Sequence, residues 1–161
     1  MRNVYFSFHY LDIWKVNQIR NSGVVGGAKS AGFADRSLWE EAKQKNSRAL
    51  EKLIADGLEG TSVTVVLIGS QTASRPWVKY EILQSIKRRN ALLGVHLNKV
   101  PDRNGRKTRQ GRVPSLLKQH DVPIHEWSND AKAFGEWVER SWRKQNEKPG
   151  LLDWIAKALG F

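Results

Sequence analysis

An indole and a carboxylate four residues apart are the side chains of this sequence best spaced to do chemistry together. Trp77 and Glu81 lie in a segment of helical periodicity at 76–89, and residues four apart share one face of an α-helix. A carboxylate beside a flat aromatic ring can hold a cationic or heterocyclic ligand. A single Glu on a helix is usually solvated and a Trp usually packs in a core. The spacing alone therefore leaves both interpretations open.

The residues before this pair predict the element that positions it. The run SVTVVLIG at 62–69 is almost wholly β-branched and apolar, which is typical of a central parallel strand covered on both faces. Pro76 can begin the following helix because its missing N–H is not needed there. Val78, Ile82 and Ile86 form the stripe that should face the sheet. The Trp–Glu pair is thus expected near the carboxyl end of the strand.

Strands and helices alternate along the rest of the chain. Apolar runs predict strands at 4–8, 91–97 and 122–127, and amphipathic spacing predicts helices at 13–21, 47–58 and about 130–144. The Gly-rich stretch 23–32 is predicted to be a flexible loop. This order predicts a doubly wound α/β fold with a mostly parallel sheet and with ligand chemistry at the carboxyl ends of its strands.

The C-terminal segment is set apart from this pattern. Pro149 and Gly150 precede LLDWIAKALGF, in which the apolar residues fall on one side of a helix: Leu151, Trp154, Ile155, Ala158 and Leu159. We therefore expect one domain at 1–147 and a C-terminal amphipathic helix within 148–161, docked on this domain or on a partner.

Composition excludes several classes of protein. The 161 residues include no cysteine, which removes disulfides and thiol catalysis and fits a reducing compartment. No stretch approaches the roughly 20 apolar residues of a membrane span, and the N-terminus does not resemble a signal peptide. A cytoplasmic location without membrane contact is expected. No Gly-x-Gly-x-x-Gly or Gly-Lys-Ser/Thr phosphate loop is present, and the four histidines lack metal-ligand spacing, so no bound metal is implied.

The net charge of +11 predicts an anionic partner. The segment 99–112 carries a dense group of cations with only Asp102 opposing them: Lys99, Arg103, Arg106, Lys107, Arg109 and Arg112. Gly and Pro residues in this segment predict a loop with a basic patch. The charge by itself does not distinguish nucleic acid, a phosphate-bearing small molecule and an acidic protein.

Three segments together resemble the TIR-like family typified by the Thoeris antiphage TIR protein. They are VYFSFHY with Asp12, FADRSLW at 33–39, and GTSVTVVLIGSQTASRPWVKYEI at 60–82, so that the resemblance covers roughly 3–97. TIR enzymes share a Trp-x-x-x-Glu element on the helix after a central strand, and Trp77-Val-Lys-Tyr-Glu81 matches it. The resemblance implies a flavodoxin-like TIR-type domain in which Glu81 is the catalytic glutamate.

The resemblance also implies the reaction. Family enzymes split the bond between nicotinamide and ribose in NAD, which is a substrate and not a cofactor, and some return cyclic ADP-ribose isomers as signals to a separate effector. Such a bond breaks through an oxocarbenium-like state with positive charge on the ribose. An ionised carboxylate that faces this charge would lower the barrier, and Glu81 is assigned that task.

Further substrate-binding residues follow from the same resemblance. Ser7, Phe8 and His9 end the first predicted strand and line the pocket in the family, while Trp77 is suited to stack on nicotinamide or adenine. Each has a plain alternative: Phe8 as core, Ser7 as a backbone hydrogen-bond partner and His9 as a polar rim residue. Asp35 and Ser37 correspond to the BB-loop region and would bind ribose, although an Asp near a Ser before a helix is also an ordinary cap.

Two other functions remain open at this point. A TIR-like scaffold would bind other TIR protomers without catalysis, and Trp-x-x-x-Glu also has structural roles in related domains. A nucleic-acid binder would use the loop at 99–112, but no recognised nucleic-acid motif accompanies it. The enzyme, with self-assembly and a separate effector as its partners, is the function we expect.

Overall fold

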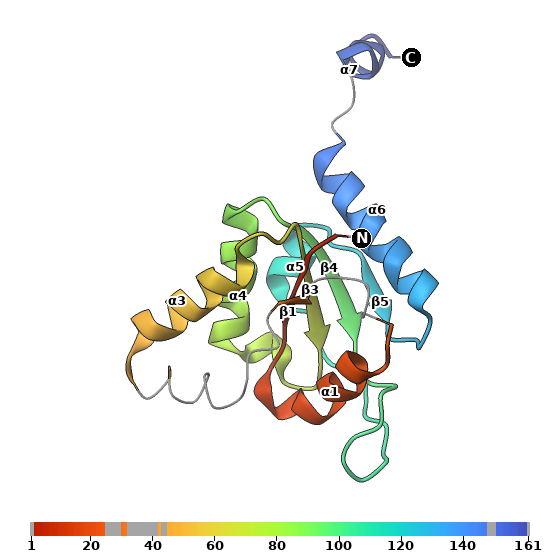
Figure 1. Ribbon diagram of the computed structural model, residues 1–161. Helices are drawn as coiled ribbons and strands as arrows, with labels where there is room; N and C mark the ends of the chain where they lie inside the picture. Colours follow the sequence, from red (N-terminus) through yellow and green to blue (C-terminus); the bar gives the residue numbers. More distant parts are fainter. Residues whose placement is uncertain (1, 25–29, 32–41, 43–44, 148–150, 161) are drawn as a thin grey trace.

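Parallel strands form the centre of the molecule (Figure 1). The computed structural model describes residues 2–24, 30–31, 42, 45–147 and 151–160. Within these residues the sheet has five strands: β1 Val4–Ser7, β2 Ser30–Ala31, β3 Val63–Ile68, β4 Ala91–His96 and β5 Ile124–Glu126. Their order is β2-β1-β3-β4-β5, and every pair is parallel.

In this strand order, the direction in which successive strands are added to the sheet reverses between β1 and β3, while all strands stay parallel. β1 pairs with β3 over its whole length, from Val4 opposite Val63 to Ser7 opposite Val66. The chain winds outward from β1 to β2 and then returns to the other side of β1, as in flavodoxin-like folds. Ligands of such sheets bind outside the carboxyl ends of the two strands at this switch point. The predicted doubly wound α/β fold is confirmed.

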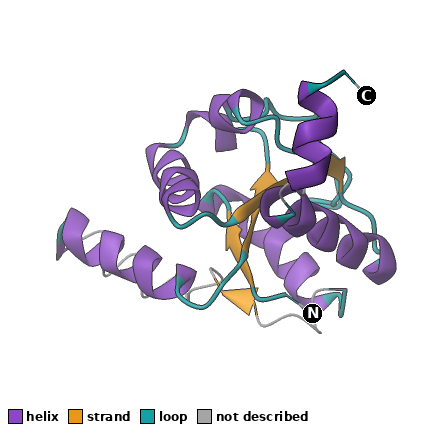
Figure 2. Ribbon diagram, turned by 90° about the horizontal axis from the view of Figure 1, so that it is seen from above, coloured by secondary structure: helices purple, strands orange, loops and turns teal. Residues whose placement is uncertain are grey.

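Helices cover both faces of the sheet (Figure 2). One face carries α1 Ile13–Asn21 and α6 Ala131–Asn146, and the other carries α3 Ser47–Leu58, α4 Pro76–Lys87 and α5 Ser115–Gln119. Short 3-10 turns, Tyr10–Asp12 and Thr72–Ser74, follow the ends of β1 and β3. The α4 helix runs back from the carboxyl edge of the sheet to its amino edge, because it connects two parallel strands.

Alternation along β1 distributes its side chains between these two layers. Val4 and Phe6 are fully buried against α1 and α6. Tyr5 points to the opposite layer and packs with the apolar face of α3, and Ser7 shares that face because side chains in a strand alternate. β1 therefore presents two hydroxyl groups to the α3 and α4 side of the sheet.

The predicted apolar stripe of α4 packs as expected. Val78 and Ile82 are buried against Val66 and Ile68 of β3, and Ile86 packs beside them. The helix begins with Pro76 in its first turn, where a proline costs no hydrogen bond. This packing fixes the rotation of α4 about its own axis.

The structure differs from the sequence prediction where elements are short. β2 has two residues and lies in the stretch that was predicted to be loop, and the five-residue α5 had no predicted counterpart. Neither is long enough to show a periodic pattern. The cap of α6 is Asp130, which accepts the Ala133 N–H at 3.0 Å, while the neighbouring Asn129 side chain accepts the indole N–H of Trp127.

A helix is confirmed in the C-terminal segment. α7 spans Leu151–Ala158 and lies beyond the end of α6, away from the sheet (Figure 1). Ile155 and Leu159 on this segment are exposed. The division into a domain at 1–147 and an appendage at 148–161 stays a prediction. No helix in the described part of the chain has the length and apolar character to cross a membrane.

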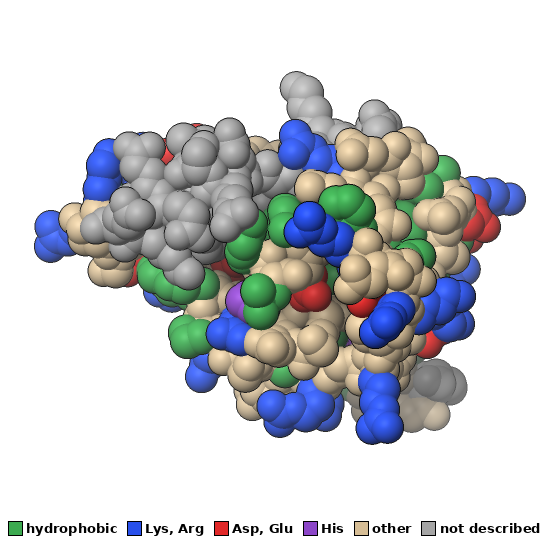
Figure 3. All heavy atoms as spheres, turned by 90° about the horizontal axis from the view of Figure 1, so that it is seen from below, with side chains coloured by type: hydrophobic (Ala, Val, Ile, Leu, Met, Phe, Trp, Pro, Cys, Tyr) green, Lys and Arg blue, Asp and Glu red, His purple; other side chains and the backbone are tan. Residues whose placement is uncertain are grey.

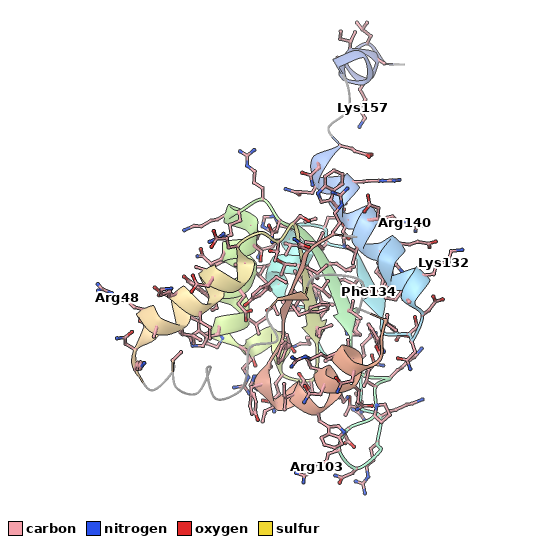
Figure 4. The ribbon with its side chains drawn as sticks, viewed as in Figure 1. Arg48, Arg103, Lys132, Phe134, Arg140 and Lys157 are labelled. Carbon is pink, nitrogen blue, oxygen red and sulfur yellow. The ribbon has the colours of Figure 1, made fainter. Side chains whose placement is uncertain are left out.

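Phe134 is the α6 residue on which the α1 and α6 layer depends. Its ring is 1% exposed, stacks on Phe6 with centroids 6.2 Å apart, and points from α6 toward the sheet (Figure 4). Phe134→Ala should lower the free energy of unfolding by about 3–5 kcal/mol, because it leaves a cavity in a packed core. Chemical denaturation measures this. Leu83→Ala, at a site 39% exposed on α4, is the control and should cost less than about 1 kcal/mol; equal losses would contradict the packing.

Candidate active site

Glu81 points from the second turn of α4 toward β1 instead of lying at the solvent rim. Its side chain is 2% exposed, because Val78 and Ile82 hold the neighbouring face of α4 against β3. The Tyr5 hydroxyl donates a hydrogen bond of 2.5 Å to Glu81 Oε2. The sequence had suggested a carboxylate at the mouth of the sheet. The structure places it under the surface, on the side of the sheet that α3 and α4 cover.

Ser7 is the second strand hydroxyl on this side. It is fully buried, and its Oγ makes no hydrogen bond of normal geometry with a described atom. The hydroxyl nevertheless lies close enough to Glu81 to favour its ionised form. Tyr5 and Ser7 thus bring two polar groups from β1 to one carboxyl group. The role of Ser7 in substrate binding stays a prediction.

A buried polar ladder fixes the backbone of α4 near Glu81. Ser85 Oγ donates to the Glu81 carbonyl at 2.8 Å, and the same hydroxyl lies 2.8 Å from Thr64 Oγ1 on β3. Asn90 Nδ2 donates to Thr64 Oγ1 at 3.2 Å. Buried polar groups are stable when each has a partner. The ladder therefore ties α4 to the sheet one turn from the candidate catalytic residue.

Burial controls the protonation of Glu81. It raises the pKa of Glu81 from 4.5 to about 8, and the Tyr5 and Ser7 hydroxyls only partly oppose this. Burial also raises the pKa of Tyr5, and the nearby Glu81 charge adds to the effect. The carboxyl is consequently neutral at neutral pH in the free protein. It can become a strong charge-stabilising group when a cation enters, because an opposite charge nearby favours ionisation.

Trp77 lies one turn before Glu81 on α4. Its indole is partly buried and meets the Tyr80 ring edge-on, with centroids 5.3 Å apart. Leu53 of α3 belongs to the same cluster. The ring therefore packs between α3 and α4 beside the Tyr5–Glu81 pair, and its stacking on a substrate ring stays a prediction.

The two predicted site residues that follow β1 lie in different surroundings. Phe8 packs with the core under α1 and α6, on the face of the sheet opposite Glu81, which favours its alternative interpretation as a core residue. His9 is partly buried, and its carbonyl accepts the Asp12 N–H at 2.9 Å at the start of a 3-10 turn. Asp35 and Ser37 lie outside the described residues. Roles for all four in substrate binding stay predictions.

The carboxyl end of β3 holds a second polar group. Gly69 N–H donates to Thr72 Oγ1 at 2.8 Å, and a Cβ added to Gly69 would lie 2.1 Å from Asp12 Oδ2. Burial raises the pKa of Asp12, while Lys15 and the Thr72 hydroxyl oppose the shift. Neither Thr72 nor Lys15 was predicted from the sequence as a site residue. No pattern could indicate Lys15, because its burial depends on the loop that follows β4.

Comparisons with known proteins agree with the fold. Residues 5–102 match the family described as "Thoeris protein ThsB, TIR-like domain". A protein of Bacillus cereus (strain MSX-D12) named "Putative cyclic ADP-D-ribose synthase ThsB1" is 40% identical over 151 residues, which cover 91% of this chain and 76% of that protein. The TIR domain of the Toll-related receptor TRR-2 from Hydra magnipapillata has a TM-score of 0.52 at 14% identity, covers 89% of this chain, and is covered to 98% itself. The receptor domain shares the fold.

The raised pKa of Glu81 makes the stability of the protein depend on pH. Between the unfolded pKa of 4.5 and the folded pKa of about 8, the folded chain holds a proton that the unfolded chain releases. The free energy of unfolding should therefore decrease as pH rises through this window, by up to about 1.4 kcal/mol per pH unit. Glu81→Gln removes the titrating carboxyl and with it this pH dependence. We expect it to be more stable than the wild type at pH 7.5, with the difference vanishing toward pH 4.

Chemical denaturation at several pH values measures this difference. Glu136→Gln, at an exposed site on α6, is the matched control and should show no such trend. A Glu81→Gln protein less stable than the wild type at pH 7.5 would show that the carboxyl is not held neutral in the fold.

Proposed function

This chain belongs to the family of TIR-like domains of Thoeris protein ThsB, and we propose that it cleaves NAD at the bond between nicotinamide and ribose. The observation that carries the proposal is the Glu81 carboxyl, buried beside Tyr5 near the switch point of a TIR-type sheet. The name of the Bacillus cereus relative also supports NAD chemistry. NAD acts here as substrate and not as cofactor.

The chemistry requires a negative charge that faces the ribose. As the glycosidic bond breaks, its electron pair stays on the nicotinamide nitrogen, which leaves as a neutral ring, and positive charge develops on the ribose. An ionised Glu81 stabilises this charge strongly because its surroundings exclude water. The cationic nicotinamide ring favours that ionised form on binding, which reconciles a neutral carboxyl in the free protein with an anionic one in the complex.

The burial of Glu81 favours a cyclic product. Water that attacks the ribose carbon gives ADP-ribose and releases a proton, whereas attack by an atom of the same substrate gives a cyclic ADP-ribose isomer. With the carboxyl 2% exposed, a ligand that reaches it has to open the surrounding packing and exclude water. We propose the cyclic product as a signal to a separate effector, with other copies of the chain as assembly partners in a prokaryotic antiviral defence.

The placement of Ser7 and Trp77 supports both as substrate contacts. Ser7 can donate to a ribose hydroxyl, because its Oγ lies near Glu81 and makes no hydrogen bond of normal geometry with a described atom. Trp77 can contact the nicotinamide ring from the preceding turn of α4. His9, Phe8, Asp35 and Ser37 complete the proposed set, with Phe8 acting through the core that supports the end of β1.

Removal of the carboxylate should abolish turnover. Glu81→Gln keeps the shape of the side chain and the Tyr5 contact but cannot become anionic, so we expect nicotinamide release to fall by about 10²–10³-fold. Mass spectrometry of nicotinamide, ADP-ribose and cyclic isomers measures this with purified protein, alone and with lysate of phage-infected cells. Glu136→Gln should match the wild type. A wild type that releases no nicotinamide under either condition would overturn the proposed activity and favour a non-catalytic TIR scaffold.

The pH profile should follow the ionisation of Glu81. For the free enzyme, kcat/KM is expected to rise with pH and level off above about 8, since the pKa of Glu81 is about 8. Tyr5→Phe removes a hydroxyl that lowers the pKa of Glu81, so its profile should shift to higher pH. An unchanged profile in a Tyr5→Phe protein that melts like the wild type would show that another group limits the rate.

A further inference from the structure

The segment between β4 and α5 forms a cationic loop at the carboxyl edge of the sheet. We call residues 99–112 the basic loop; they contain six Lys or Arg residues and Asp102 as the acid. Viewed from this edge, Lys and Arg side chains predominate over Asp and Glu (Figure 3). Arg103 lies at the far end of the loop (Figure 4). The cations of the loop are exposed to solvent.

The acid in this loop holds the turn. Asp102 Oδ1 accepts the backbone N–H groups of Asn104 at 2.8 Å and Arg106 at 2.9 Å. The Asp102 N–H in turn donates to the Arg106 carbonyl at 2.8 Å. These bonds close a compact turn at the outer end of the loop. The Asp102 carboxylate thus stabilises the backbone turn that carries the neighbouring cations.

Two contacts fasten the loop to the carboxyl ends of the central strands. Lys15 of α1 is 5% exposed and donates to the Leu97 carbonyl at 3.2 Å and to Thr108 Oγ1 at 2.9 Å. The backbone of Gly111 lies directly on the end of β3, where an added Cβ would be 2.0 Å from the Gly69 carbonyl oxygen. A glycine is required there because no side chain fits. The loop is therefore a fixed wall of this edge.

The exit of the loop turns to the same side of the sheet as Glu81. Val113 packs against the cluster formed by Ile68 of β3 and Val78 of α4. The backbone from 111 to 113 thus passes from the end of β3 to the layer that holds α4. Arg109 and Arg112 flank the Gly111 contact and are both exposed.

The cations nearest this contact form no ion pair within the part of the chain that the structure describes. Lys99 pairs with Glu126 at 2.5 Å, but Arg109 and Arg112 form no ion pair with any acid that the structure describes. Like charges held close together repel one another, and a bound anion relieves that repulsion. The guanidinium fork also matches two phosphate oxygens at once.

We propose that Arg109 and Arg112 bind the pyrophosphate of the dinucleotide substrate. The inference rests on the proposed function, because it orients NAD with its nicotinamide ribose toward Glu81 and its phosphates at the end of β3. β1, which carries Tyr5 and Ser7, is the direct neighbour of β3. The basic loop thus gives the protein a preference for a diphosphate over an uncharged nucleoside.

The test compares two double variants that remove the same charge. Arg109→Gln/Arg112→Gln changes the proposed site, and Lys87→Gln/Arg88→Gln removes two exposed cations from the end of α4 at the amino edge. Nicotinamide release is measured with NAD and with nicotinamide riboside, which has no phosphate. We expect the loop variant to raise the KM for NAD about tenfold and to leave kcat and the riboside kinetics within about twofold. The control variant should match the wild type in all of these.

Charge and geometry are separated by a third variant and by binding. Arg109→Lys/Arg112→Lys keeps both charges but loses the planar forks, so its KM for NAD should lie between that of the wild type and that of the Gln variant of the loop. Titration calorimetry with ADP should show about tenfold weaker binding for the Gln variant. An unchanged KM for NAD in an active Gln variant overturns the proposal and leaves the proposed function standing.

The remaining outcomes separate the two proposals. A wild type that binds ADP through the loop but never cleaves NAD supports the loop site and overturns the proposed function. If the Gln variant of the loop loses binding to a fluorescent oligonucleotide but keeps its affinity for ADP and its KM for NAD, the pyrophosphate site is overturned in favour of nucleic acid. Its salt dependence would then be steep.

Discussion

The hydrogen bond between Tyr5 and Glu81 joins the first strand to the helix after the central strand inside the core. It ties two segments 76 residues apart in sequence and holds the carboxyl on the side of the sheet that α3 and α4 cover. A buried carboxyl is costly unless it stays neutral, which is why the pKa of Glu81 is raised to about 8. At neutral pH this burial lowers the free energy of unfolding, and a positive charge bound nearby would favour ionisation of the carboxyl.

The flavodoxin-like strand order supplies the setting for this pair. Because β1 and β3 are neighbours at the switch point, their ends bring Ser7 and Gly69 to one edge of the sheet. Gly69 and Gly111 allow backbone to meet backbone there, and Asp12 fills the space that a side chain on Gly69 would take. The edge therefore has a buried carboxyl on one side and a cationic loop on the other, an arrangement that suits the proposed dinucleotide with its positive ring and negative phosphates.

Sequence patterns predicted the long elements well because each buries a continuous apolar face. The helices at 13–21 and 47–58 agree with α1 and α3, and the stripe led by Val78 packs on the sheet as predicted. The elements that were missed, β2 and α5, are too short to carry a period. Phe8 shows the limit of reasoning from neighbours in sequence, since strand alternation sends it to the opposite face from Ser7.

The sequence by itself determined the α/β class, the family and the identity of Glu81 as the residue to examine, because these depend on periodicity and on a local Trp-x-x-x-Glu motif. Only the tertiary structure decided that this carboxyl is buried and neutral, because its partners Tyr5 and Ser7 come from a strand more than seventy residues earlier. It also decided that the basic loop is fixed at the site, since burial of Lys15 and the contact of Gly111 with β3 arise from long-range packing.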